Sequence, residues 1–137
     1  MDIKEAVAFC RENHNAVLTT LKKDGSPQMS PVTVGVSPDG TQVVISSRQT
    51  AIKVKNLHRD GRAWLAVFTN GFYGPWVQIA GPAEIVSLPA AMPLLEDYYR
   101  DISGEHPDWD DYRAAMEKDQ RCIIRITPTE VGPNIGG

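Results

Sequence analysis

The sequence predicts a mainly β protein of the α+β class, with about six short antiparallel strands in a small barrel and helices around it. Three observations predict this fold. Several short segments are rich in β-branched and apolar residues, and some alternate with a period of two. Turns rich in Gly, Asp, Asn and Pro separate these segments. Four other segments have the apolar spacing of amphipathic helices.

Length and composition predict one globular domain over residues 1–137 in the cytoplasm. Apolar residues make up 42% of the chain, charged residues 23%, and the net charge is −3. No run of about 18 apolar residues exists, so we expect no membrane span. The charged N-terminus lacks the apolar core of a signal peptide. The mild overall acidity argues against a general nucleic-acid binder.

The N-terminal half is expected to contain one helix and three strands. The helix covers residues 2–13, and Asp2 is placed to cap it. The strands, which are joined by tight turns, cover residues 16–21, 28–36 and 41–46. Residues 22–26 contain Asp24-Gly25, a strong short-range signal for a hairpin. Because Pro31 cannot donate a ladder hydrogen bond, the second strand lies at an edge or is bulged there.

The remaining segments continue the alternation of strands and helices. Thr50 is a candidate cap for a helix that ends near His58. Further strands are predicted over residues 62–69, 76–86 and 122–127, and further helices over residues 89–102 and 107–118. Gly81-Pro82 predicts a bulge or kink in the long strand. Pro107 suits the first position of the last helix.

A basic segment, residues 46–62, is the first candidate for a binding site. Five cations occur in it: Arg48, Lys53, Lys55, Arg59 and Arg62. A helix N-terminus beside fixed cations is a typical phosphate site. Lys53 and Lys55 are two residues apart and diverge by about 200° on a helix, so both cannot meet one phosphate. A solvated helix face remains the alternative explanation.

Other kinds of site have weaker support. The histidines have no partner at helical spacing, and Cys10 and Cys122 have no metal-type spacing, so no metal site is expected. The chain contains no G-x-S-x-G and no glycine-rich phosphate loop, so the catalytic residues remain unassigned. The turn over residues 70–76, "NGFYGPW", is unusually apolar, which favours a contact with a ligand or a second subunit.

The order of these segments resembles a known family. An N-terminal helix precedes "AVLTTLKKDGSPQMSPV", "VVISSRQTAIKVKNLHRDGRAWLAV" and "WVQIAGPAEIV". From about residue 3 to residue 131, this pattern resembles the pyridoxamine 5′-phosphate oxidase-like proteins. The resemblance implies a six-stranded antiparallel split β-barrel of the FMN-binding type with flanking helices. The segment "GEHPDWDDYRAAM" resembles the actinobacterial flavin/deazaflavin oxidoreductases that bind coenzyme F420.

The resemblance also implies a homodimer whose cofactor lies in a groove between the two barrels. The deazaflavin carries the hydride, and the protein supplies position and electrostatics. The positions that match cofactor-binding residues form three groups: Gln28, Ser30 and Pro31 along the second strand; Ser46, Lys53, Lys55 and Asn56 near the phosphate; and Trp76 and Gln78 near the ring system. Trp76 is expected to reach the ring from the other subunit.

The departures from the family pattern favour F420 over FMN. FMN-dependent relatives carry an arginine-rich second strand, whereas "MSPVTVGV" has no charge. Ala51 stands where close relatives have a basic residue, and Arg48 or Lys55 is a candidate replacement. We therefore expect an F420-dependent oxidoreductase that gives hydride to an activated double bond of a small hydrophobic molecule, with the proton from solvent or Tyr73. An FMN enzyme and a non-catalytic carrier of F420, FMN or haem remain the alternatives.

Overall fold

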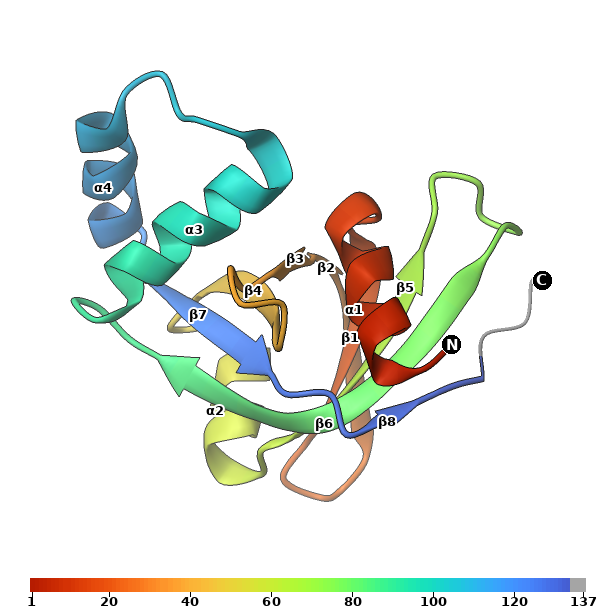
Figure 1. Cartoon of the computed structure of the whole chain (residues 1–137). Helices are drawn as coiled ribbons and strands as arrows, with labels where there is room; N and C mark the ends of the chain where they lie inside the picture. Colours follow the sequence, from red (N-terminus) through yellow and green to blue (C-terminus); the bar gives the residue numbers. More distant parts are fainter. Residues whose placement is uncertain (134–137) are drawn as a thin grey trace.

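The structure is a computed structural model that describes residues 1–133, and Figure 1 shows its arrangement. The strands are β1 (Asn15–Leu21), β2 (Pro27–Thr33), β3 (Gly35–Val36), β4 (Val43–Arg48), β5 (Arg62–Phe68), β6 (Trp76–Val86), β7 (Arg121–Ile126) and β8 (Glu130–Val131). The helices are α1 (Ile3–Glu12), α2 (Ile52–Arg59), α3 (Ala91–Ser103) and α4 (Trp109–Lys118). None of the helices within residues 1–133 is long and apolar enough to span a membrane.

The strands form one curled antiparallel sheet in the order β2-β1-β5-β6-β7-β4-β3, and β8 adds to β6. The two ends of this order, β2 and β3, are consecutive pieces of one chain segment. Val34 separates them, and its N–H donates to the carbonyl of His14 at 2.8 Å. The segment therefore pairs with β1 before Val34 and with β4 after it, which brings the sheet round on itself and leaves a split beside β2.

The split-barrel fold with flanking helices is confirmed, with one difference in the strands. The strand expected over residues 28–36 is divided into β2 and β3, and the described chain has two-residue strands at β3 and β8 besides six longer ones. Gly35 lies tightly against α3, where an added Cβ would stand 3.2 Å from Asp101 and 3.3 Å from Tyr98. This contact with α3 helps to hold the segment at the position where its partner strand changes.

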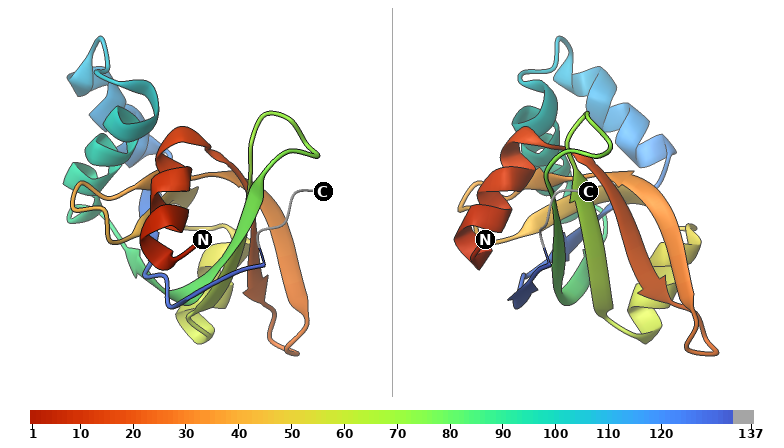
Figure 2. Two further views of the ribbon diagram at one scale, coloured as in Figure 1. Left: turned by 45° about the vertical axis from the view of Figure 1, so that its right-hand side comes forward. Right: turned by 90° about the vertical axis from the view of Figure 1, so that its right-hand side faces the viewer.

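Two apolar clusters stabilise the molecule. The first fills the barrel and includes Leu18, Ile45, Leu65, Ile79 and Ile124, with α1 packed against it through Ala6, Val7 and Cys10. The second lies under α3 and α4 and consists of Val44, Ala91, Leu95, Tyr112 and Ile123. Figures 1 and 2 show α3 and α4 side by side outside the sheet, next to β7. These two helices form what we call the α3–α4 hairpin.

The long strand β6 passes from one partner to another at the predicted kink. It pairs with β5 as far as Pro82 and with β7 from Ala83 onwards, without an interruption of the strand. Gly81 is required here, because an added Cβ would lie 2.0 Å from the carbonyl oxygen of Thr127. Residues 127–129 thus cross close over β6 before β8 begins.

The helix ends confirm one predicted cap and correct two others. Asp2 caps α1 and accepts from the N–H of Glu5 at 2.8 Å, as predicted. Asp108 caps α4 and accepts from Asp111 at 3.1 Å, so Pro107 precedes the cap and does not occupy the first helical position. The cap residue of α2 is Ala51 rather than Thr50, and no side chain caps this helix.

Candidate functional site

A cavity of about 950 Å³ lies in the split of the barrel, between the end of β2 and the end of β4. We call it the split cavity. The α3–α4 hairpin forms its other wall, so strand ends, the start of α2 and two helices border this open cavity. Its volume is at the upper end of the range for small-molecule sites. Its lining residues from the sheet include Asn15, Pro31, Val32, Thr33, Ser46 and Ser47.

The floor of the split cavity is suited to an anion. Three cations line it: Arg48, Lys53 and Arg121. The N-terminus of α2 also opens here, and its first turn has no acidic residue and no side-chain cap. The N–H groups of an uncapped first turn and the helix dipole both favour negative charge. The sequence suggested that Thr50 caps α2, but the cap residue is Ala51, which has no side chain that can cap the helix. The start of α2 therefore forms part of the site.

Lys53 and Lys55 occupy different environments. Lys53 is half-buried and lines the split cavity, whereas Lys55 is exposed and lies outside it. Their side chains point in different directions because two residues on a helix are about 200° apart. Neither ammonium group has a hydrogen-bond or ion-pair partner among residues 1–133. Lys53 is therefore the lysine of α2 that is free to meet a ligand in the cavity.

Tyrosines of the α3–α4 hairpin form the opposite wall. The hydroxyl of Tyr98 donates to the carbonyl of Thr33 at 2.9 Å, and that of Tyr112 donates to the carbonyl of Leu95 at 2.8 Å. Burial raises the pKa of Tyr98, and it raises the pKa of Tyr112 to about 12, so both stay neutral near pH 7. Among the described residues, Tyr99 has no such partner for its hydroxyl, so this hydroxyl can bond a ligand.

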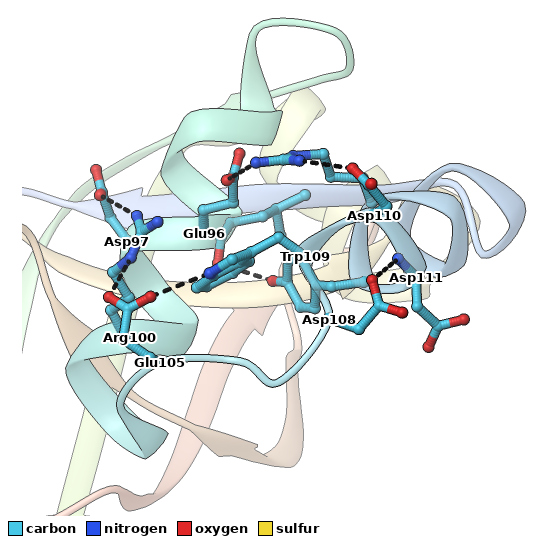
Figure 3. Close-up of polar contacts among 11 residues, drawn as sticks. Glu96, Asp97, Arg100, Glu105, Asp108, Trp109, Asp110 and Asp111 are labelled. Atoms are coloured by element: carbon cyan, nitrogen blue, oxygen red, sulfur yellow. Dashed lines mark hydrogen bonds and ion pairs between the residues drawn. The ribbon is translucent and has the colours of Figure 1, made fainter.

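A network of ion pairs and rings holds this wall in place (Figure 3). Arg113 bonds Glu96 at 2.8 Å across the two helices. Glu105 accepts from Arg100 and from the indole N–H of Trp109, both at 3.0 Å. The Arg100 guanidinium also lies 4.3 Å from the centroid of the Trp109 ring. Arg100 and Arg113 therefore each pair with acids of the hairpin, and these pairs help to hold its two helices together.

Gln28 and Asn56, two of the predicted cofactor residues, belong to a network below the cavity. Asn56 is 4% exposed and donates to the hydroxyl of Thr20 at 3.1 Å. The same hydroxyl donates to Gln28 at 3.3 Å, and Arg59 donates to Asn56 at 2.9 Å. These bonds attach α2 to the barrel. The structure thus places both residues where they position α2 and Lys53, without lining the split cavity.

Three more predicted residues lie outside the split cavity in the single chain. The Ser30 hydroxyl is buried without a hydrogen-bond partner in the described part of the chain. Trp76 and Gln78 are half-buried on the outer face of the sheet. Gln78 lines a second, open groove of about 460 Å³ there, together with Met29 and Trp64. Of the predicted set, the split cavity brings together Pro31, Ser46 and Lys53.

Sequence reasoning missed most of the residues from the hairpin and β7. The cavity is lined by Tyr98, Tyr99, Tyr112, Met116 and Arg121, none of which was assigned to the site. The pattern that predicted the α3 and α4 helices assigned their aromatic residues to apolar stripes. Only the position of the hairpin beside β4 and β7 shows that these stripes also face a cavity. Arg121 had one available clue, since it begins a strand otherwise composed mainly of apolar residues.

The described residues offer no evident metal site or reactive thiol. Within residues 1–133, no group of three or more His, Cys, Asp or Glu side chains is arranged to hold a metal ion. Both cysteines are buried and unpaired. Burial raises the pKa of Cys10 to about 12 and that of Cys122 to about 11, so both thiols are protonated near neutral pH.

The fold and the cavity together define a split-barrel protein with a cavity whose floor is positively charged. The family model described as pyridoxamine 5′-phosphate oxidase matches residues 3–134, and the chain belongs to this family. Proteins of this family are generally oxidoreductases.

Three solved structures illustrate the range of proteins that share the fold. An F420 reductase is 21% identical with a TM-score of 0.66, and the match covers 91% of this chain and 94% of that one. A pyridoxamine 5′-phosphate oxidase-related, FMN-binding protein from Nostoc punctiforme is 15% identical with a TM-score of 0.64, covering 93% and 75%. A haem-binding protein from Mycobacterium smegmatis is 20% identical with a TM-score of 0.73; the match covers 98% of this chain and 53% of that chain.

Proposed function

We propose that this protein is an F420-dependent oxidoreductase that reduces an activated double bond in a small hydrophobic molecule. The observation that carries this proposal is the convergence of Lys53, Ser46 and the uncapped start of α2 on one cavity. A fixed cation, a hydroxyl and free backbone N–H groups are all favourable partners for a phosphate group. The residues present therefore fit the phosphate of a flavin-type cofactor.

When bound, the deazaflavin would supply the hydride chemistry. The residues of this chain would bind and orient it. Lys53 and the first turn of α2 would hold the phosphate, and Pro31 would pack along the cofactor from β2. The described lining of the split cavity contains no carboxylate, histidine or cysteine, so we expect the product proton to come from solvent.

The charge distribution supports F420 over FMN. The end of β2 contributes Pro31, Val32 and Thr33 to the cavity, none of which is charged. The cations come instead from β4, α2 and β7, as Arg48, Lys53 and Arg121. The similarity to an F420 reductase and to an FMN-binding protein supports a flavin-type cofactor, and the lack of an arginine on β2 is our reason for preferring the deazaflavin.

We also propose that the protein acts as a homodimer through the outer face of β1, β2, β5 and β6. This face carries the groove lined by Met29, Trp64 and Gln78, and Met29 is 64% exposed. An apolar sheet face of this kind favours association with another apolar surface. Trp76 and Gln78 lie on this face, and in such a dimer we expect Trp76 to reach the cofactor of the other subunit.

The direct test is a titration of the purified protein with F420, followed by cofactor fluorescence or calorimetry. We expect binding at tens of micromolar or tighter, and weaker binding by Lys53→Ala. Lys55→Ala is the matched control, because Lys55 lies on the same helix outside the cavity. No binding by the wild-type protein, or equal losses in both variants, would rule out the proposed phosphate site.

Two other functions would use the same cavity. An FMN enzyme of this family would be yellow as purified and would release FMN on denaturation. The lack of a carboxylate, histidine or cysteine in the described cavity lining favours the other alternative, a non-catalytic carrier of F420, FMN or haem. Tight F420 binding without turnover across a panel of enones and quinones would support the carrier.

A further inference from the structure

Two arginines differ from all the others in the described chain. Arg11, Arg59, Arg62, Arg100, Arg113 and Arg125 each donate at least one side-chain hydrogen bond to a carboxylate or carbonyl oxygen. Arg48 and Arg121 donate none to any residue within 1–133. Both line the split cavity. The guanidinium groups without hydrogen bonds are therefore gathered at one site.

The geometry of this pair is unfavourable without a ligand. Arg48 and Arg121 are direct partners in the β4–β7 ladder. Like charges directly opposite each other destabilise a sheet. The nearest carboxylate is Asp119, whose Oδ2 is 3.9 Å from Arg48 and 3.7 Å from Arg121, too far for a hydrogen bond to either. The Nε of Arg121 is also buried without a hydrogen-bond partner.

We propose that Arg48 and Arg121 form a second anion subsite in the split cavity, separate from the phosphate position at Lys53. A carboxylate or phosphate oxygen between the two guanidinium groups would accept hydrogen bonds from both and offset their repulsion. This inference rests on the proposed function in one respect, because that function places the phosphate of the cofactor at Lys53. The ligand class that follows carries two anionic groups, one for the start of α2 and one for the ends of β4 and β7.

Asp119 has a defined part in this subsite. At 3.7 to 3.9 Å it partly neutralises the arginine pair when no ligand is present, and it repels an anion that enters. Removal of its charge should therefore strengthen anion binding, whereas removal of either arginine should weaken it. These opposite effects distinguish an anion subsite from an ion cluster that serves only stability, because in such a cluster the loss of any member would destabilise the fold without changing anion affinity.

The test uses the cofactor-free protein at low ionic strength, with inorganic phosphate and acetate as probes and the arginine Nε–H resonances as the readout. We expect phosphate to shift the Arg121 Nε–H resonance in the wild-type protein and in Lys53→Ala. Arg48→Gln should lower the affinity reported by that resonance about tenfold, the loss of one charge-assisted hydrogen bond. Asp119→Asn should raise it. The acetate arm distinguishes a carboxylate site from one that needs phosphate.

Arg62→Gln is the matched control, since Arg62 bonds Asp60 at 2.9 Å and lies outside the split cavity. Unfolding curves of all the variants check that the fold is retained. An Arg121 resonance unmoved by both anions, or Asp119→Asn with lower affinity than wild type, would overturn the subsite. A protein that binds phosphate at Arg121 but ignores F420 and FMN would refute the proposed function and leave the subsite standing.

Discussion

The floor and the hairpin wall of the split cavity contain similar side chains and use them differently. In the wall, Arg100 and Arg113 are paired with acids at 3.0 and 2.8 Å (Figure 3). On the floor, Lys53 has no partner and Arg48 and Arg121 have no hydrogen bond within the described chain. Charges that are hydrogen-bonded to an acid fix a structure, whereas cations in a cavity without hydrogen bonds raise the free energy of the empty protein and favour a ligand.

The same contrast applies to the tyrosines of the wall. Tyr98 and Tyr112 donate to backbone carbonyls and serve the fold. Tyr99 packs against Trp109 and Tyr112 through its ring and keeps its hydroxyl available. We infer that changes in the floor should alter ligand affinity with little effect on stability, and that changes in the wall should mostly do the reverse.

The largest effect is expected from Leu95→Ala. Leu95 is fully buried beneath the hairpin, in the cluster with Val44 and Ile123. The lost contacts and the remaining cavity should lower the free energy of unfolding by about 3 kcal/mol. Urea unfolding measures this change. A loss below about 1 kcal/mol would mean that the hairpin is only loosely attached to the sheet and is not a fixed wall.

A cap introduced at the start of α2 tests the floor. Ala51 already has the extended conformation of a cap residue, with φ −65° and ψ 146°. Ala51→Asp should place a carboxylate on the free N–H groups and stabilise the protein by about 1 kcal/mol. The same carboxylate competes with a bound anion and should weaken phosphate or F420 binding by about 2 kcal/mol, roughly 30-fold.

Thr50→Ala is the control for this variant, because Thr50 makes no capping bond to α2. We expect it to leave both stability and anion affinity unchanged, measured by urea unfolding and by calorimetric titration. If Ala51→Asp binds anions as the wild-type protein does, the start of α2 is not part of the anion site.

Local patterns account for the parts of the fold that the sequence predicted correctly. The strands and hairpin turns follow from short segments such as Asp24-Gly25, and the cap at Asp2 follows from that residue and the N–H of Glu5 three positions on. The closure of the barrel does not follow from such patterns. The partner of residues 27–36 changes at Val34, beside a contact between Gly35 and α3, and these two segments are far apart in the sequence.

The site was predictable only in part for the same reason. The helical angle between Lys53 and Lys55 is a local property, and it correctly separated the two side chains. Asn56 was assigned to the cofactor, but it is buried in a hydrogen-bond network with Thr20, a residue of another strand. The pairing of Arg48 with Arg121 depends on the β4–β7 register, which no local pattern specifies.

Tyr99→Phe and Tyr112→Phe form a matched pair that tests the division within the wall. Tyr99→Phe should leave stability unchanged and weaken ligand binding by about 1 kcal/mol, roughly fivefold, through the loss of one hydrogen bond. Tyr112→Phe removes a buried bond to Leu95 and should cost about 1 kcal/mol of stability with little change in affinity. Urea unfolding and ligand titration measure the two effects. If both variants lose stability alone, or both lose ligand affinity alone, Tyr99 and Tyr112 do not have the different roles that we assign to them.

A last prediction concerns the buried face of β7, where Cys122 follows Arg121. Burial raises the pKa of Cys122 to about 11 and that of Cys10 to about 12, from 9.0 for an ordinary thiol. Below pH 9.0 both folded and unfolded thiols are protonated, so this contribution to stability is fully present. As the pH rises towards 11 the unfolded thiols ionise first, and stability is lost.

Urea unfolding between pH 8 and pH 11 measures this loss, and Cys10→Ala with Cys122→Ala is the comparison. At pH 8 the double variant should be less stable because of the small cavities left by the missing thiols, but its decline with pH should be shallower than that of the wild-type protein. Tyr98 and Tyr112, whose pKa values are also raised, contribute equally to both curves. If the stability of the two proteins falls in parallel with pH, the thiols are not shielded from water. In that case β7 separates its charged cavity face from the core less completely than the burial of Cys122 indicates.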